Sequence, residues 1–340
     1  MLKKVKASEA VGMVLGYDIT EVVPGKRKGP ALRKGHRIRE EDVEVLLRTG
    51  NDYVWVIEPE EGELHEDEGA MRLARAAAGE GLEVIPGREG RAMIRTTARG
   101  LLKVQRELVD LINLRGELVL STLHDNTPCE EGTLVAIARI IPLMIREAEI
   151  RWAEGVLSHG RALHLKPYRR RKVGAVVTGN EVYYGRIPDA FDDKVRPKLQ
   201  HYGAELSGKV VVPDDPQLIA EAITSLLDRG ADLIIATGGL SVDPGDVTPE
   251  GIRLTGAEII NYGSPVLPGA MFLYAILGEA DILGLPACVY YNPRTIFDLV
   301  LPRVMAGERP SREEIRRLGY GGLCLNCAEC RFPVCPFGRV

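Results

Sequence analysis

Short runs of consecutive apolar residues, such as 173–177 and 233–236, recur in the second half of the chain. They alternate with longer stretches whose apolar positions repeat every three to four residues. A run that is apolar at every position suits a strand buried on both faces, and the three-to-four spacing suits an amphipathic helix. The alternation predicts an α/β domain over residues 169–310, a mostly parallel three-layer α/β sandwich with helices on both faces of one sheet.

The clearest predicted helix lies in the stretch DDPQLIAEAITSLLDRG, residues 214–230. Asp215 suits the N-cap of this helix, and Pro216 suits its first helical position. A second helix is expected in DAFDDKVRPKLQHYG, residues 189–203, where Pro197 should bend or break it. The predicted buried stripe of the first helix consists of Leu218, Ile219, Ala222, Ile223, Leu226 and Leu227.

The first half of the chain carries shorter and more varied patterns. Short β-like runs surround one helix that begins near Glu40, residues 62–81 are helix-like, and residues 83–168 are β-rich with one short helix candidate. The predicted division is a small β-rich module (1–60), a helix followed by a β-rich module (61–168), the α/β domain (169–310) and a cysteine-rich tail (311–340).

Composition and charge exclude some classes of partner. The 340 residues carry a net charge of −4, and aromatic residues make up only 5% of the chain. A nucleic-acid-binding protein would show a dominant basic face or an aromatic stacking platform. No apolar run approaches the ~20 residues that span a bilayer, and the N-terminus lacks the apolar core of a signal peptide. The sequence therefore predicts a cytoplasmic protein whose partners are neither nucleic acid nor membrane.

Two of the predicted strands end in the same way. VVTGNEV and IIATGGLSVDPGD both place Thr-Gly at the strand exit, which is the edge where parallel sheets bind ligands. Glycine lets a ligand approach backbone N–H donors, so these loops suit an anionic group such as phosphate. The carboxylates of Glu181, Asp243 and Asp246 suit a phosphate only if a divalent cation such as Mg²⁺ joins them. In the competing interpretation each Thr-Gly is only a turn.

The motifs VGAVVTGNEV, VVVPDDPQLIAEAI and ADLIIATGGLSVDPGD follow one another in the order found in a known family. Together they resemble the molybdopterin-binding domain shared by MogA, MoaB, MoeA and gephyrin, and the resemblance covers residues ~172–307. It implies binding of molybdopterin or adenylyl-molybdopterin, use of Mg²⁺, and cleavage of the adenylate with insertion of molybdate, as in a molybdopterin molybdenumtransferase. By analogy the chain is expected to form a homo-oligomer, either a dimer or a trimer.

The same resemblance assigns roles to individual residues. Glu181, Asp246 and Asp215 would be catalytic, with Asp214 as an alternative to Asp215, and these carboxylates would face magnesium or molybdate. The residues implied to bind the pterin and its phosphate are Thr178, Gly179, Asn180, Thr237, Gly238, Gly239, Ser241 and Asp243.

Several residues depart from the family pattern. Asn180 stands where the signature has aspartate, Asp243-Pro244 replaces a glycine-containing step, and Gly-Leu-Pro-Gly-Asn-Pro becomes GLPACVYYNP. These changes favour the alternative of a non-catalytic carrier that delivers finished cofactor to a molybdoenzyme. The N-terminal stretch PALRKGHRIREEDVEVLL resembles SAF-type modules instead, which leaves a ligand-sensing module as a third interpretation.

Four of the six cysteines lie close together near the C-terminus. Cys324, Cys327, Cys330 and Cys335 have the spacing C-x2-C-x2-C-x4-C. Four thiolates within twelve residues suit one metal centre, either an iron–sulfur cluster or a closed Zn²⁺ site. A tail of free thiols is the remaining alternative. The other two cysteines, at 129 and 288, are expected to be small residues in the core or a loop.

Overall fold

The computed structural model describes residues 2–23, 27–57, 60–87 and 90–339. The chain forms two compact units. Unit 1 takes most of residues 1–164, and unit 2 takes residues 165–340 together with two short segments, 98–103 and 124–131. The four-part division expected from the sequence stays a prediction. No helix among the described residues is long and apolar enough to cross a membrane.

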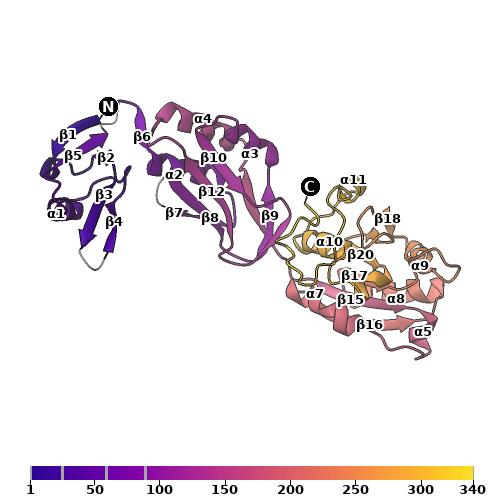
Figure 1. Ribbon diagram of the computed structural model, residues 1–340. Coiled ribbons are helices and arrows are strands. Elements are labelled where there is room, and N and C mark those ends of the chain that lie inside the picture. The colour runs from indigo at the N-terminus through magenta and orange to yellow at the C-terminus, as the bar shows by residue number, and fades with distance from the viewer. Residues whose placement is uncertain (1, 24–26, 58–59, 88–89, 340) are drawn as a thin grey trace. The chain divides into compact units, whose positions relative to one another are not determined.

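Unit 1 consists of small antiparallel sheets with a few helices (Figure 1). Its strands are β1 (Leu2–Lys6), β2 (Val14–Leu15), β3 (Ile19–Val23), β4 (Arg27–Leu32), β5 (Tyr53–Ile57), β6 (Glu63–His65), β7 (Leu82–Pro86), β8 (Arg91–Thr96), β10 (Leu118–Thr122), β12 (Leu134–Ile140) and β13 (Met144–Arg146). Its helices are η1 (Ala7–Glu9), α1 (Glu40–Arg48), α2 (Glu66–Ala77), α3 (Arg106–Asn113) and α4 (Glu147–Ser158).

Most of the elements predicted for unit 1 are present, with one clear omission. Helix α1 begins at Glu40 as expected, and the helix-like stretch 62–81 is a short strand followed by α2. The β-rich interpretation of residues 83–168 missed α4, which buries Ile150, Ala153 and Leu157. These three apolar residues have helical spacing, so the signal for α4 was in the sequence.

Unit 2 contains a six-stranded sheet, a smaller sheet and the remaining helices. Its strands are β9 (Gly100–Val104), β11 (Thr127–Cys129), β14 (Leu163–Pro167), β15 (Lys172–Thr178), β16 (Glu205–Val212), β17 (Leu233–Thr237), β18 (Glu258–Tyr262), β19 (Leu273–Leu277) and β20 (Ala280–Leu285), with the ends of β9 and β14 reaching into unit 1. Its helices are α5 (Asn180–Tyr183), α6 (Phe191–Lys194), α7 (Arg196–His201), α8 (Pro216–Asp228), α9 (Thr248–Leu254), η2 (Ala287–Tyr290), α10 (Ile296–Met305) and α11 (Arg312–Arg317).

The large sheet has the strand order β16-β15-β17-β20-β19-β18. The first four strands run parallel, and β19 and β18 complete the sheet in antiparallel pairing. Because the carboxyl ends of parallel strands share one edge, the loops after β15, β16, β17 and β20 all leave the sheet at that edge.

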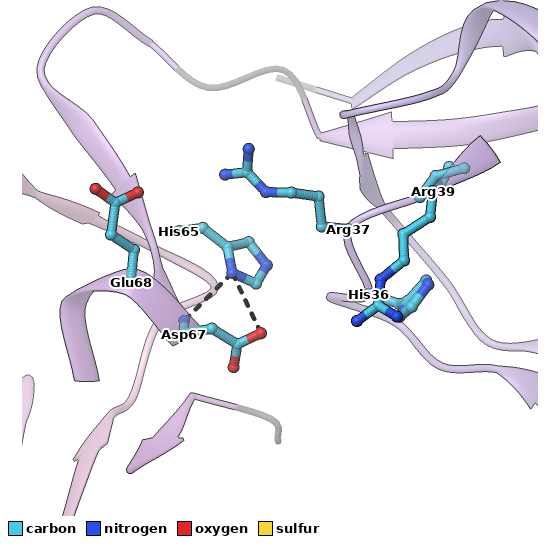
Figure 2. Close-up of a pocket in the computed structure, with 7 residues that line it drawn as sticks. His36, Arg37, Arg39, His65, Asp67 and Glu68 are labelled. Carbon is cyan, nitrogen blue, oxygen red and sulfur yellow. Dashed lines mark hydrogen bonds and ion pairs between the residues drawn. The ribbon is translucent and has the colours of Figure 1, made fainter. Parts of the chain in front are cut away.

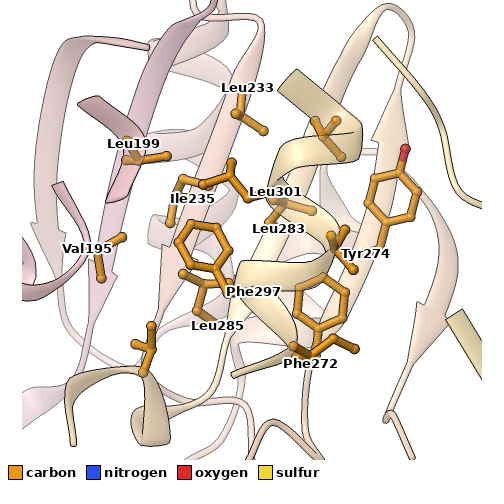
Figure 3. Packing of buried hydrophobic residues seen from close by; sticks show 14 of the residues in the cluster. Val195, Leu199, Leu233, Ile235, Phe272, Tyr274, Leu283, Leu285, Phe297 and Leu301 are labelled. Atoms are coloured by element: carbon orange, nitrogen blue, oxygen red, sulfur yellow. The ribbon is translucent and has the colours of Figure 1, made fainter. Parts of the chain in front are cut away.

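Helices cover both faces of this sheet, because alternate residues of each strand point to opposite sides. Ile235 and Leu283 face a core completed by Phe297 and Leu301 of α10, as Figure 3 shows. Ile234 lies on the other face, in a core to which α8 and α9 contribute. The predicted mostly parallel three-layer α/β sandwich is therefore confirmed.

The two helices predicted in detail form, but the predicted buried stripe of α8 is wrong at Leu218, which is exposed because it lies in the first turn, and Leu227 is only half-buried. The carboxylate of Asp215 caps α8, and Pro216 is its first residue. The stretch 189–203 is divided into α6 and α7 at Val195. Pro197 lies in the first turn of α7, where its missing N–H costs nothing, so the predicted break is observed.

Candidate functional site

The exits of β15 and β17 lie side by side at one edge of the sheet. The last pair in their register joins Val177 to Thr237, so Thr178 and Gly238 leave the sheet together. A Cβ atom on Gly238 would collide with the carbonyl oxygen of Thr178, and Gly238 has a φ of 92°. Glycine is therefore required at this contact. The two glycine-containing exits come together, as the sequence indicated.

A pair of buried threonine hydroxyl groups fixes the two exits to each other. Thr248 Oγ1 donates to the carbonyl oxygen of Gly238 at 2.8 Å, and Thr178 Oγ1 lies 2.9 Å from Thr248 Oγ1. The Thr178 hydroxyl also lies 3.2 Å from Thr237 O, so its single proton is shared between Thr237 O and Thr248 Oγ1, both inside the protein. The Thr178 hydroxyl is thus committed inside the protein and positions the loops. Sequence reasoning missed Thr248, although a Thr-Pro pair at a helix start was a signal for it.

The loop after β17 offers backbone donors that have no internal use. The N–H groups of Gly239, Leu240 and Ser241 donate no hydrogen bond to any other described residue. The hydroxyl of Tyr262 in β18 contacts two carbonyl groups of the same loop. It lies 2.8 Å from Leu240 O and 3.2 Å from Ser241 O. Unpaired N–H groups on a fixed loop are the arrangement that binds anions.

Asn180 connects the exits of β15 and β16. Its backbone N–H donates to Asp214 Oδ2 at 2.9 Å, and its Oδ1 accepts the N–H of Asp214 at 3.4 Å. An aspartate at position 180 would place a second carboxylate beside Asp214, and like charges repel at this range. The pairing gives a physical reason for asparagine where the family signature has aspartate.

The three predicted catalytic carboxylates lie in different surroundings. Asp215 Oδ1 accepts the N–H groups of Gln217 and Leu218 at 2.9 and 3.0 Å, so one of its oxygens is used as a helix cap. Asp246 Oδ2 accepts the N–H of Asp243 at 2.8 Å. Glu181 is exposed on α5. The structure does not show which of them would meet a ligand, so their catalytic roles stay predictions.

These carboxylates do not form a metal cage. Among residues 2–23, 27–57, 60–87 and 90–339, no three His, Cys, Asp or Glu side chains are placed to hold a metal ion. Mg²⁺ commonly binds through one or two carboxylates and completes its shell with substrate phosphate and water. The residues present therefore fit a magnesium ion that arrives with a phosphate-containing ligand.

The exit of β20 adds a cavity that the sequence did not reveal. Helix η2 follows this strand, and the phenol of Tyr290 faces Thr237 there. Burial raises the pKa of Tyr290 to about 12, so the phenol stays neutral at physiological pH. Lys198 borders the cavity and donates to Pro293 O at 2.9 Å and to Asp298 Oδ2 at 2.7 Å. The cavity measures about 310 Å³, and its lining includes Asp193, Lys194, Lys198, Tyr290, Tyr291 and Asn292.

Unit 1 has a cavity of its own, about 340 Å³ in volume, shown in Figure 2. His65 is buried beside it, with Nε2 donating to Gly35 O at 2.7 Å and Nδ1 accepting the N–H of Asp67 at 3.2 Å. His36 Nε2 lies 2.6 Å from Asp42 Oδ2. Both histidines are thus used inside the protein. The lining combines Arg37, Arg39, Asp67 and Glu68, so neither sign of ligand charge is favoured.

The four tail cysteines are free thiols in an irregular segment. Cys324 and Cys335 are half-buried against the core of unit 2, whereas Cys327 and Cys330 are exposed. Burial raises the pKa of the Cys330 thiol, but the N–H of Phe332 and the Arg294 guanidinium outweigh it and lower the pKa overall. A metal at the tail stays a prediction.

The remaining two cysteines lie outside the tail. Cys129 is buried in β11, where burial raises its pKa to about 11. Cys288 is half-buried on η2. Neither lies at an exposed position suited to a reactive thiol.

Comparison with known proteins gives two family matches and several partial relatives. Residues 174–306 match the family described as a probable molybdopterin binding domain, and residues 4–58 match a domain of unknown function. A CinA-like protein of Mycobacterium avium is 37% identical over 90 residues, 26% of this chain and 21% of that protein. A molybdopterin molybdenumtransferase of Synechococcus elongatus is 28% identical over 162 residues, 45% of this chain and 39% of that protein.

The overlap with each curated relative is partial. The chain spans about a fifth of the length of the first and about two fifths of the second. Among solved structures, the molybdopterin biosynthesis enzyme MoaB of Thermus thermophilus is 24% identical, with 41% of this chain and 98% of that chain covered and a TM-score of 0.35. The family match coincides with the sheet and the loops described above. The chain therefore contains, at residues 174–306, a domain of the probable molybdopterin binding family.

Proposed function

We propose that the chain binds molybdopterin, free or adenylylated, at the sheet edge where β15, β16, β17 and β20 end. The family match supports the class of ligand. The observation that carries the proposal is the loop at Gly239–Ser241, whose N–H groups are unused by the described residues and lie next to the Gly238–Thr178 contact. A phosphate needs such donors, and no acceptor among the described residues competes with it for these three N–H groups.

Each residue implied by the sequence has a place in this proposal. Gly179, Gly238, Gly239 and Ser241 would surround the phosphate with backbone and hydroxyl donors. Thr178 would position the loops because its hydroxyl is engaged with Thr248. The other residues proposed to contact the pterin or border its site are Asn180, Thr237 and Asp243.

The chemistry that fits these residues is Mg²⁺-assisted cleavage of an adenylate, coupled to molybdate insertion. Magnesium would neutralise the phosphate oxygens. Glu181 and Asp246 would position the ion or molybdate, and Asp215 would assist through the oxygen that does not cap α8. The relative named as a molybdopterin molybdenumtransferase supports this reaction class.

A non-catalytic carrier is the second candidate, and two contacts favour it. Asn180 stands where the family signature has an aspartate, so one carboxylate is missing. One oxygen of Asp215 is used as a helix cap. A carrier would need the phosphate-binding loop but fewer free carboxylates. Its partner would be a molybdoenzyme that receives the finished cofactor. In both cases we propose a homo-oligomer that acts in the cytoplasm.

Mass spectrometry of small molecules released from natively purified protein tests the proposal. We expect a pterin carrying the dithiolene and a phosphate or adenylate. Release of AMP from adenylyl-molybdopterin in the presence of Mg²⁺ and molybdate then separates the candidates: turnover indicates the enzyme, and binding without AMP indicates the carrier. The absence of any bound pterin, together with no uptake of added molybdopterin, would refute both.

A further inference from the structure

The last part of unit 2 forms a loop whose two ends meet. Gly338 donates its N–H to Gly321 O at 3.0 Å, which closes residues 321–338, here called the cysteine loop. All four clustered cysteines lie inside it. No helix or strand is assigned between residues 324 and 339, so hydrogen-bonded secondary structure does not fix the segment that carries the sulfur atoms.

Both ends of the cysteine loop are fixed to the α/β domain. At the first end, Leu267 donates to Gly322 O and accepts from the N–H of Cys324, each at 2.8 Å. At the second end, Phe337 is 5% exposed in the core. Arg339 donates to Cys335 O at 3.1 Å and to Thr127 Oγ1 at 2.5 Å. These bonds hold Cys324 and Cys335 against the same domain.

The middle of the loop carries the two exposed cysteines and a tight turn. Asn326, just before Cys327, has a φ of 48°, a conformation that asparagine tolerates better than most residues. Its amide donates to Asn292 Oδ1 at 3.0 Å, which ties the turn to the segment after η2. Cys327 and Cys330 are thus presented on a short exposed stretch between two fixed ends.

Two arginines lie beside the cysteine loop, and one of them, Arg294, also pairs with Asp298. Arg294 lies 4.9 Å from the centre of the Phe332 ring and within hydrogen-bonding reach of the Cys330 sulfur. Arg339 lies at the other end of the loop, close to Cys335. A metal bound by four thiolates carries a net negative charge, and neighbouring guanidinium groups would stabilise it.

We propose that the cysteine loop binds one thiophilic metal centre through Cys324, Cys327, Cys330 and Cys335. Its spacing, its closed ends and the flanking arginines suit this chemistry better than a solvent-exposed tail of thiols. The sulfur atoms are not gathered in the present conformation. Metal binding to such short motifs commonly drives the local folding that gathers the ligands, so the exposed middle is the part that would move. The shared chemistry is a four-thiolate site, filled by Zn²⁺ or by an iron–sulfur cluster.

Metal analysis of the full chain, purified without oxygen and without chelators, tests the proposal. We expect either about one zinc per chain, or iron with an equal amount of acid-labile sulfide. The double variant Cys327→Ser/Cys330→Ser should lose at least about ten-fold of this metal, since removing two of four ligands opens the site. Both residues are exposed, so this variant should fold, and far-UV circular dichroism checks it.

Cys129→Ala is the matched control, because it removes a thiol outside the loop and should keep the full metal content. Titration of metal-free protein with Co²⁺ adds a readout through the absorption of tetrahedral thiolate coordination. Three results would each overturn the proposal: no zinc or iron in the wild type with no Co²⁺ uptake, the same metal content in the double variant, or cysteines joined as disulfides without metal. None of these results bears on pterin binding, so the two proposals fail separately.

Discussion

The strand exits and the cysteine loop are two ways to build a binding site on one domain. At the exits, Gly238 and Thr178 touch, Thr248 locks them, and the donors of Gly239–Ser241 are in place before any ligand arrives. In the cysteine loop the ends are held by backbone bonds, the middle is held by side-chain contacts of Asn326 and Phe332, and no secondary structure holds it.

The two sites differ in which interactions order their residues. The exits are organised by the sheet, so ligand binding should change them little. The cysteine loop has two fixed ends and four thiol ligands. Binding of a metal to these thiols would order the middle of the loop. Variants at the exits should therefore alter the stability of the whole domain, whereas changes in the loop should act locally.

The largest effect is expected from Gly238→Ala. The new Cβ would collide with Thr178 O at a φ of 92°, and we expect a loss of about 3 kcal/mol or more in the free energy of unfolding. Urea denaturation followed by circular dichroism measures it. Gly245→Ala in the same loop meets no atom within 4 Å and should stay within about 0.5 kcal/mol of wild type. Equal stability of the two variants would contradict the close contact between the exits.

A smaller loss is expected from Thr248→Val. The change removes the hydroxyl that donates to Gly238 O and contacts the Thr178 hydroxyl, which keeps only its bond to Thr237 O, and this loss in a buried place costs about 1–3 kcal/mol. Thr224→Val is the control, because its hydroxyl only bonds to Ala220 O within its own helix. The same denaturation assay applies. A Thr248→Val protein as stable as the control would mean that the hydroxyl pair does not lock the exits.

Removal of the metal should affect the cysteine loop and leave the strand exits unchanged. Chelation of metal-loaded protein should make residues 321–338 sensitive to proteolysis while the unfolding free energy of the domain changes by less than about 1 kcal/mol, because Phe337 is the one described residue of the loop in the buried part of the main core. Mass spectrometry of the cleavage products locates the cuts. A chelator that unfolds the whole domain would show that the comparison between the sites is wrong.

The smallest effect is expected from Asn180→Asp, which restores the aspartate of the family signature. A second carboxylate beside Asp214 should cost roughly 0.5 kcal/mol at low ionic strength and less at high salt, since this exposed pair is screened. Stability measured at two salt concentrations tests it. Asn180→Ala loses the side-chain acceptor without adding charge, so its loss should not depend on salt. A salt-independent Asn180→Asp would refute the electrostatic explanation.

The sequence predicted the α/β sandwich because its strands are apolar at every position. That pattern arises when a strand is buried on both faces, as 173–177 and 233–236 are. The antiparallel β18 and β19 were not foreseen. Strand β18 lies at the edge of the sheet and lacks a continuous apolar run, whereas β19 is the apolar run LYAIL, so a signal for it was in the sequence. Local pattern also could not show that residues 98–103 and 124–131 leave unit 1 for unit 2, since that depends on contacts distant in sequence.

For the candidate site, sequence motifs located the loops but not their internal bonds. Thr178 was expected at the ligand, and its hydroxyl is turned to Thr248. Asp215 was expected to be catalytic and also to cap α8, and the cap is what the structure shows. Which side chain pairs with which is decided by packing in three dimensions, so spacing alone could not separate positioning groups from ligand donors.

Equilibrium binding of molybdopterin to the purified full chain tests the central claim most directly, measured for wild type, Gly239→Ala and Gly245→Ala. A Cβ on Gly239 would lie 2.7 Å from Thr248 Oγ1 at a φ of 58°, so this change should displace the donors of the phosphate loop. The account predicts that wild type and Gly245→Ala bind alike and that Gly239→Ala binds at least about ten-fold more weakly, a difference of about 1.4 kcal/mol. Equal affinity of all three proteins, or no binding by the wild type, would contradict it.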